Sequence, residues 1–425
     1  MKILSAAELP KDFFSYRDEE VSDLVREIIQ HVKTSGDKAL REYSEWFDGV
    51  TLETLRYDPE RIKAAYKTVA PEAVEALRRA AEHIRRFAEV QRRALADVEV
   101  ELTPGVFTGQ KVQPIGRVGV YAPGGRFPLV SSLLMGGIPA RVAGVETLVV
   151  CSPPSFQGAI HPAILVAADI IGADEVYAVG GAQAIAAMAY GSESIRPVDK
   201  IVGPGNKYVA QAKKEVFGVV GIDLIAGPTE VLIIADDSAQ PEILAADLLA
   251  QAEHDADASA ILVTPSTELA GKVQREVERQ LAALKNRQTA AASIGQNGVI
   301  VLVDGLAEAV EIANHKAPEH LEVQLARPEE VVPHLKNFGA LFVGEHAAEV
   351  LGDYSSGINH TLPTNSTARY RGGLSVLDFL KIQSTLRVSA EGFANIGPLA
   401  EQLAVTEGLG AHAQAIEIRR QLLRG

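Results

Sequence analysis

Cysteine is nearly absent from this chain of 425 residues, because Cys151 is its single thiol. One cysteine cannot form an internal disulfide, so we expect a protein of the reducing cytoplasm. No apolar run approaches the ~20 residues of a membrane span. The stretch from Met1 to Ser5 is soon followed by charged side chains, not by the apolar core of a signal peptide. The sequence therefore predicts a soluble protein that neither crosses a membrane nor is exported.

Positive charge is also scarce. Lys and Arg total 41 against 55 Asp and Glu, which gives a net charge of −14. No basic run is dense enough to follow a phosphate backbone, so we expect no nucleic-acid partner. At the usual ~150 residues per domain, the length predicts two or three domains that fold without disulfides.

Hydrophobic periodicity predicts two kinds of structure. Apolar residues recur at helical spacing from Val21 to Val32, with Gly36 as a C-terminal cap, and again from Val74 to Phe87. From about Val118, short β-branched runs alternate with helical stretches, which is typical of parallel βαβ units. The predicted strands are 118–121, 148–151, 176–179, 201–202, 231–235, 261–264, 300–303 and 341–343.

We predict an α/β fold with two doubly wound, Rossmann-like lobes that have parallel sheets, together with N-terminal helices and a C-terminal helical arm. The segment from Gly221 to Pro228 is interpreted as a crossing between the lobes. The predicted division assigns 1–20 to an N-terminal helical segment, 121–235 to one lobe, 21–120 with 236–373 to a discontinuous second lobe, and 374–425 to the arm, either a separate cap or a dimerisation element.

Glycine-rich segments follow three of the predicted strands. They are Tyr121-Ala122-Pro123-Gly124-Gly125, Gly180-Gly181-Ala182-Gln183 and Gly203-Pro204-Gly205-Asn206-Lys207. Loops at the carboxyl ends of parallel strands commonly bind ligands, and glycine lets backbone amides approach phosphate. None matches G-x-G-x-x-G, so tight-turn glycine remains the alternative to a nucleotide site.

Three polar segments in the second half are candidates for chemistry. Gln251 and His254 are spaced to share a helix face and could bind one ion, although a solvated helix end is the alternative. Glu319 and His320 pair a carboxylate with an imidazole, the groups most used to move protons, although such pairs also occur by chance on surfaces. The loop from Asp353 to His360 is unusually polar for a packing segment.

Taken together, these segments resemble the histidinol dehydrogenase family from about Val112 to His412. The stretches that carry the resemblance are Gly203-Pro204-Gly205-Asn206-Lys207-Tyr208-Val209, Ala226-Gly227-Pro228-Thr229-Glu230-Val231-Leu232, Gln251-Ala252-Glu253-His254-Asp255, Ala317-Pro318-Glu319-His320-Leu321-Glu322 and Gly352-Asp353-Tyr354-Ser355-Ser356-Gly357-Ile358-Asn359-His360. The resemblance implies NAD-dependent oxidation of L-histidinol to L-histidine through histidinaldehyde, the last step of histidine biosynthesis.

The resemblance also implies a site, residue by residue. It assigns one zinc ion per subunit to Gln251, His254, Asp353 and His412, and catalysis to Glu319 and His320. It assigns NAD to Tyr121, Gln183 and Asn206 in the 121–235 lobe. The residues that it implies for binding histidinol are Thr229, Gln251, His254, His320, Asp353, Glu407 and His412.

The chemistry of these residue types agrees with the implied roles. A neutral imidazole suits the removal of a hydroxyl proton near neutral pH, which favours His320 as the base of the alcohol oxidation. The aldehyde must add water before a second hydride can leave, and the family pattern implies Glu319 for that step. Ligands without thiolate leave room for two nitrogen donors of histidinol, so we expect the ion to orient the substrate.

Two other functions are compatible with parts of the sequence. An NAD-dependent aldehyde dehydrogenase would need Cys151 as its nucleophile, but this residue ends an apolar strand and reads as a buried, inert thiol. The second is a metal-dependent protein that binds a small molecule between two α/β lobes. Such proteins are usually exported, whereas this sequence shows no signal-peptide core. We further expect a homodimer that exchanges its C-terminal arms, so that Glu407 and His412 reach the partner's site.

Overall fold

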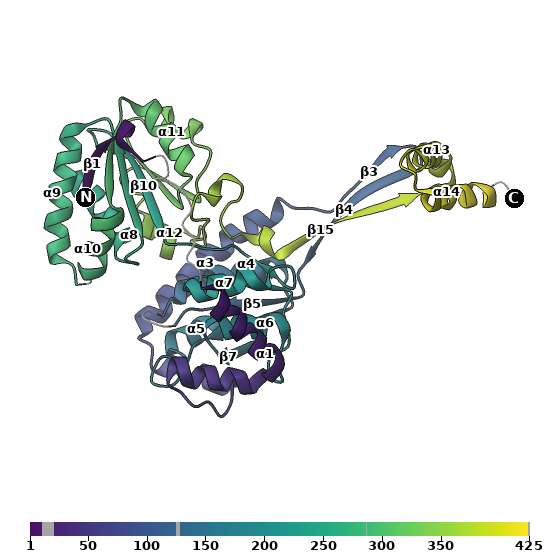
Figure 1. Ribbon diagram of the computed structural model, residues 1–425, viewed down its shortest axis with the longest axis horizontal. Helices are drawn as coiled ribbons and strands as arrows, with labels where there is room; N and C mark the ends of the chain where they lie inside the picture. The colour runs from purple at the N-terminus through teal and green to yellow at the C-terminus, as the bar shows by residue number, and fades with distance from the viewer. Residues whose placement is uncertain (11–20, 125–127, 286, 424–425) are drawn as a thin grey trace.

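The computed structural model describes residues 1–10, 21–124, 128–285 and 287–423. Their strands form two six-stranded sheets and one three-stranded sheet. Figure 1 shows two lobes side by side and a long arm that projects away from both. Among these residues, no helix combines the length and apolarity needed to cross a bilayer.

The first lobe is built on the sheet with strand order β2-β7-β6-β5-β8-β9, in which every pair is parallel except β2 with β7. Its strands are β2 (Arg56–Tyr57), β5 (Arg117–Tyr121), β6 (Thr147–Ser152), β7 (Glu175–Ala178), β8 (Lys200–Val202) and β9 (Gly221–Ile222). One face packs on α1 (Ser22–Tyr43), α6 (Gly181–Tyr190) and α7 (Lys207–Val216), and the other on α3 (Pro71–Arg93), α4 (Val130–Ala143) and α5 (Pro162–Ile170). The short α2 (Pro59–Ala64) contacts α5. Both faces are covered, as parallel sheets require.

The second lobe is built on an all-parallel sheet with strand order β1-β12-β11-β10-β13-β14. Its strands are β1 (Lys2–Ser5), β10 (Glu230–Ala235), β11 (Ser259–Thr264), β12 (Val299–Leu302), β13 (His320–Gln324) and β14 (Ala340–Val343). One face packs on α8 (Pro241–Ala252), α9 (Thr267–Ala283) and α10 (Arg287–Asn297), and the other on α11 (Leu306–Lys316). The short α12 (Glu349–Tyr354) follows β14.

The arm is an antiparallel ribbon with strand order β15-β4-β3, and two helices form its tip (Figure 1). Its elements are β3 (Val98–Thr103), β4 (Val106–Pro114), β15 (Leu380–Val388), α13 (Ala390–Thr406) and α14 (Gly410–Leu422). Many large apolar side chains of the arm are exposed, among them Leu102, Leu386, Leu399, Leu403 and Leu422.

The arrangement corrects the predicted division of the chain in four places. Residues 2–5 form a strand rather than a helix, while 11–20 lie outside the described residues. Within 21–120, α1 and α3 pack on the first lobe, and β3 and β4 belong to the arm. β10 lies inside the second sheet although 230–235 was assigned to the first lobe. The stretch 374–425 contains β15 and is not purely helical. The common reason is that partners distant in sequence decide which sheet a segment joins.

Gly36 does not end the first helix as predicted. Its φ of 51° interrupts the helical backbone, but the helix resumes and continues to Tyr43. A kink at glycine is one of the usual ways in which a long helix bends.

Candidate active site

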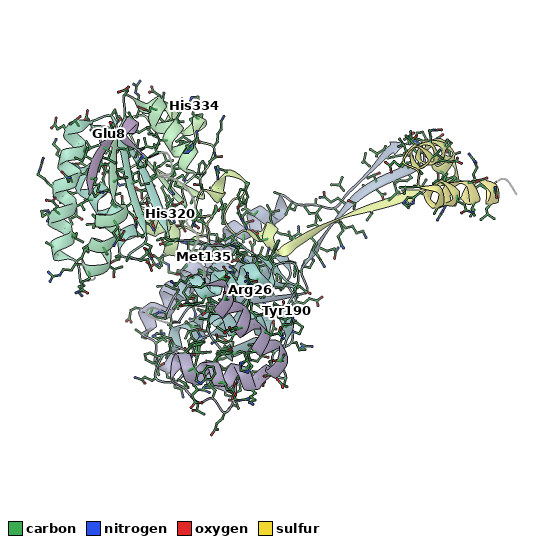
Figure 2. The ribbon with its side chains drawn as sticks, in the orientation of Figure 1. Glu8, Arg26, Met135, Tyr190, His320 and His334 are labelled. Carbon is green, nitrogen blue, oxygen red and sulfur yellow. The ribbon has the colours of Figure 1, made fainter. Side chains whose placement is uncertain are left out.

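The predicted catalytic and metal residues of the second lobe gather at the amino ends of its strands. Thr229 directly precedes β10, Glu319 precedes β13, and His320 is the first residue of β13. Gln251 is in the last turn of α8, and His254 lies just beyond the end of that helix. Figure 2 shows His320 on the side of the second lobe that faces the first. Ligand sites usually occupy the carboxyl ends of parallel strands, so this cluster lies at the opposite edge.

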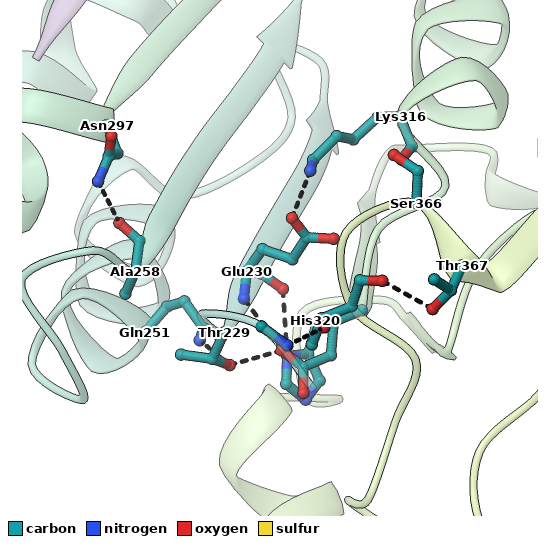
Figure 3. Close-up of polar contacts among 12 residues, drawn as sticks. Thr229, Glu230, Gln251, Ala258, Asn297, Lys316, His320, Ser366 and Thr367 are labelled. Atoms are coloured by element: carbon teal, nitrogen blue, oxygen red, sulfur yellow. Dashed lines mark hydrogen bonds and ion pairs between the residues drawn. The ribbon is translucent and has the colours of Figure 1, made fainter. Parts of the chain in front are cut away.

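Glu319 is held by two donors. The Thr229 hydroxyl donates to its Oε2 at 2.6 Å, and the backbone N–H of Glu230 donates to the same oxygen at 3.0 Å. The Glu230 carbonyl oxygen lies 3.3 Å from Nδ1 of His320 (Figure 3). When Nδ1 carries the ring proton and donates to this carbonyl, Nε2 keeps a free lone pair. Glu230 thus orients both members of the predicted catalytic pair, one through its backbone N–H and the other through its carbonyl group.

Burial shifts the pKa values of the pair in opposite directions. Desolvation raises the pKa of Glu319 to about 8, against the smaller lowering effect of its two hydrogen bonds. Desolvation also lowers the pKa of His320 to about 4. Low dielectric disfavours the charged form of either group, so at neutral pH the imidazole is neutral and the carboxyl group is largely protonated.

Possible metal ligands lie directly beside this pair. Ligand atoms of His254, Glu349 and Asp353 all lie within 4.8 Å of one another. The Gln251 amide lies between Thr229 and Glu349: in one orientation its nitrogen donates to the Thr229 hydroxyl, and in the other it donates to the Glu349 oxygens at 3.0 and 3.1 Å. The first orientation points the amide oxygen towards the carboxylates, as an ion there would require.

These donors fit a zinc ion. Zinc takes imidazole nitrogen and carboxylate oxygen at ~2.0–2.2 Å, mostly in tetrahedral geometry, so two of its ligand atoms lie roughly 3.5 Å apart. The three ligand atoms lie within 4.8 Å of one another, so side-chain movements of about 1 Å would bring them to that separation. Glu349 is the member of this cluster that the sequence did not predict, and the only sequence signal for it is its position four residues before Asp353 in α12.

Two further carboxyl groups are buried next to the cluster. Asp247 precedes Gln251 by about one turn of α8, and Glu322 follows His320 by two residues in β13, on the same face of the sheet. Glu322 is fully buried, and its carboxyl group lies within hydrogen-bonding reach of the Asp247 carboxyl group. Desolvation raises the pKa of Asp247 to about 6, and desolvation together with the charge of Asp247 raises the pKa of Glu322 well above its usual value.

The residues predicted to contact NAD lie at the carboxyl edge of the first sheet. Tyr121 ends β5, and its hydroxyl accepts from the Gly181 N–H at 3.1 Å. Gln183 is 2% exposed, and its Oε1 has no partner among the described residues. Such an unpaired buried acceptor is expected to bind a ligand or water. Asn206 is exposed and caps α7 through its Oδ1, which leaves its amide nitrogen available. Gly125, in the first glycine segment, lies outside the described residues.

Polar contacts join the lobes next to the cluster. The His360 Nε2 lies 3.2 Å from the Ser132 hydroxyl in α4, and the Asn359 amide donates to the Met135 carbonyl at 2.8 Å. His360 also contacts the backbone oxygen of Asp353 through Nδ1 at 3.0 Å. The polar loop after Asp353 therefore contacts the first lobe.

Cys151 is unsuited to be a nucleophile. It is fully buried in β6, and desolvation raises the pKa of its thiol to about 12. A reactive cysteine needs the opposite, namely exposure and a lowered pKa. The thiol-dependent alternative is therefore wrong.

The two predicted site residues of the arm are not brought to the cluster within one chain. Glu407 follows α13, and His412 lies in α14. Both are exposed at the tip of the arm, away from both lobes (Figure 1). Within a single chain, the cluster thus contains every predicted metal ligand except His412.

The comparisons with known proteins agree with one another. The histidinol dehydrogenase family pattern matches residues 14–420. The histidinol dehydrogenase of Geobacillus kaustophilus is 49% identical over 401 residues, which cover 94% of each chain. That of Rhizobium meliloti is 49% identical over 406 residues, covering 95% of this chain and 93% of the relative. A crystal structure of histidinol dehydrogenase from Elizabethkingia anophelis has a TM-score of 0.94 and 38% identity, and the match covers 100% of this chain and 99% of that one.

All three comparisons indicate one family. The family pattern spans nearly the whole chain, the two relatives have 49% sequence identity, and the crystal structure superposes over the full length. The chain therefore belongs to the histidinol dehydrogenase family, NAD-dependent oxidoreductases that contain zinc and oxidise histidinol in the last step of histidine biosynthesis.

Proposed function

We propose that the cluster around Glu319 and His320 is where this chain oxidises L-histidinol to L-histidine, and that NAD binds at the carboxyl edge of the first sheet. The observation that carries the proposal is a buried acid and base with opposite pKa shifts directly beside a set of metal donors. Groups whose pKa values are pushed apart are typical of assigned acid and base roles.

His320 acts as the base of the first oxidation. Its ring is neutral at pH 7, and the Glu230 carbonyl accepts the Nδ1 proton, so Nε2 can take the hydroxyl proton of histidinol as hydride leaves its carbon. Glu319 acts in the second oxidation. Its pKa of about 8 allows a fraction of the carboxylate to accept a proton from the water that adds to the aldehyde.

Gln251, His254 and Asp353 would hold the zinc ion, which when bound orients the imidazole and amino nitrogens of histidinol. Thr229 then lies within reach of the substrate while it keeps Glu319 in place. Tyr121, Gln183 and Asn206 bind NAD, Gln183 through its unpaired oxygen and Asn206 through the nitrogen that the helix cap does not use.

Two chains share each site in this proposal. The arm exposes a series of large apolar side chains, which a second copy would cover in a symmetric dimer. Exchange of arms would bring His412 as the fourth protein ligand and Glu407 as a substrate contact. We also place the protein in the cytoplasm, because its one thiol is free.

Purified protein with histidinol and NAD should form NADH, and a chelator should abolish this activity in a way that added zinc restores. Absence of histidinol-dependent NADH would refute the assigned activity.

A mixing experiment tests the shared site. Co-expression of His320→Ala with His412→Ala should recover roughly a quarter of wild-type activity, because random pairing gives half heterodimers and each has one intact site. If every site lies within one chain, the mixture stays as inactive as its components.

A further inference from the structure

A buried ion pair holds one residue, Gly203, of the loop that follows β8. Lys213 in α7 and Asp223 after β9 are 2% and 3% exposed and form an ion pair. The Lys213 ammonium donates to the carbonyl oxygen of Gly203 at 3.0 Å, and the Gly203 N–H donates to the Asp223 carboxylate at 2.7 Å. Both polar groups of a single glycine are thus bound by opposite charges.

This glycine packs tightly against the predicted NAD residues. Its φ is +116°, and a Cβ at Gly203 would lie 2.2 Å from the Tyr121 carbonyl oxygen. Asn206 follows three residues later and caps the amino end of α7, the helix that carries Lys213. The position of Gly203 therefore determines where the loop that leads to Asn206 lies relative to Tyr121.

Asp223 also connects this loop with the second lobe. It begins the segment that crosses from β9 to β10, and its carbonyl oxygen accepts from the Arg371 guanidinium, on the segment that returns from the second lobe. Arg371 contacts Asp378 at 3.2 Å, and the Lys200 ammonium of β8 donates to the Asp378 carbonyl at 2.6 Å. The segment that leaves the first lobe after β9 and the segment that returns to it with Arg371 therefore meet beside the ion pair.

We propose that Lys213 and Asp223 are positioning residues for NAD, which fix the Gly203 loop in the conformation that binds the cofactor. The proposal rests on the assignment of Tyr121 and Asn206 to NAD made above. Neither charge is exposed, so the pair acts through the loop rather than by touching the cofactor.

The test is calorimetric titration of NAD into the zinc-loaded enzyme without histidinol, for Lys213→Met and for the double variant Lys213→Met with Asp223→Asn. Lys213→Met leaves a lone buried carboxylate and should lower the melting temperature. The double variant removes both charges and should regain much of that loss. In both variants the Gly203 carbonyl lacks its donor, so the Kd for NAD should rise about tenfold or more, with zinc content unchanged.

Two further variants distinguish the possible failures. Lys214→Met changes the exposed neighbour on the same helix and should leave NAD affinity within about twofold. Asn206→Asp keeps the helix cap and removes the amide donor, so it tests the proposed NAD contact itself. If Asn206→Asp weakens NAD binding but the double variant binds as well as wild type, the positioning role is wrong and the site stands. If neither variant changes affinity, the assigned NAD contacts are wrong as well.

Discussion

The buried carboxyl pair of Asp247 and Glu322 makes the second lobe sensitive to pH in a direction opposite to ordinary acid denaturation. The pKa of Asp247 is about 6 in the folded chain, against 3.8 for the free side chain. The unfolded chain therefore releases this proton first, and the contribution of Asp247 to the stability of the lobe falls as pH rises from about 4 to about 6 and then levels off. A difference of about 2 pKa units corresponds to about 3 kcal/mol above pH 7.

Asp247→Asn cannot ionise and should remove this cost. The variant should be more stable than wild type by up to about 3 kcal/mol at pH 8 and by about half of that at pH 5. For a lobe of this size the gain at pH 8 corresponds to a melting temperature roughly 5–10 °C higher. Its new amide can also donate to the Glu322 carboxyl group, beside which Asp247 lies.

Scanning calorimetry of chelator-treated protein at both pH values is the suitable assay, because bound metal would add its own stabilisation. Tryptophan fluorescence is unsuitable, since Trp46 lies beside α1 on the first lobe. Glu268→Gln on the exposed side of α9 is the matched control and should change stability by less than about 1 kcal/mol. Equal stability of Asp247→Asn and wild type at pH 8, or a gain that does not change with pH, would show that Asp247 carries no ionisation cost.

Three other outcomes follow from the site. Glu319→Gln should keep much of the oxidation of histidinol to the aldehyde, but oxidise added histidinaldehyde about 10²-fold or more slowly. In the wild-type enzyme the rate of aldehyde oxidation should rise with pH around 8, as the pKa of Glu319 implies. Stopped-flow measurement of NADH formation follows the two oxidations, and an equal fall of both rates in Glu319→Gln would contradict the role of Glu319 as the base for water. Cys151→Ala should retain activity within about twofold and melt at a slightly lower temperature, since its thiol only packs; a dead variant that remains folded by circular dichroism would revive thiol chemistry. His254→Ala should lose zinc, measured by atomic absorption, and histidinol turnover together while it still binds NAD, and an equal loss of NAD affinity would argue against separate sites.

The sequence predicted the strands whose apolar residues are consecutive, since β5, β6, β10 and β11 are buried on both faces. It missed β13, because His320, Glu322 and Gln324 alternate with apolar residues and yet are buried. Buried polar side chains that form a site cannot be distinguished in the sequence from polar side chains on an exposed surface. The arm strands were missed for a related reason, because a ribbon exposed on both faces has no apolar run.

The motifs identified the residues of the site, but they did not predict that these residues lie at the amino ends of the strands. Segments far apart in the chain converge there, so Glu349 could be recognised only once α12 was placed beside α8 and β13. His412 marks the opposite limit. Its family match predicts a ligand, while α14, the helix that carries it, lies at the tip of the arm, away from the cluster of the same chain.

The pairing of β1 with β12 has a consequence for synthesis of the protein. Lys2 lies opposite Val299, so the first strand meets its neighbour only after 299 − 2 = 297 further residues have been made. At ~5–20 residues per second this takes roughly 15–60 s. During that time the sheet of the first lobe, whose strands are all made by β9, can form on the ribosome, while β1 waits without a partner. Conditions that slow translation would lengthen the exposure of this strand and favour aggregation of nascent chains.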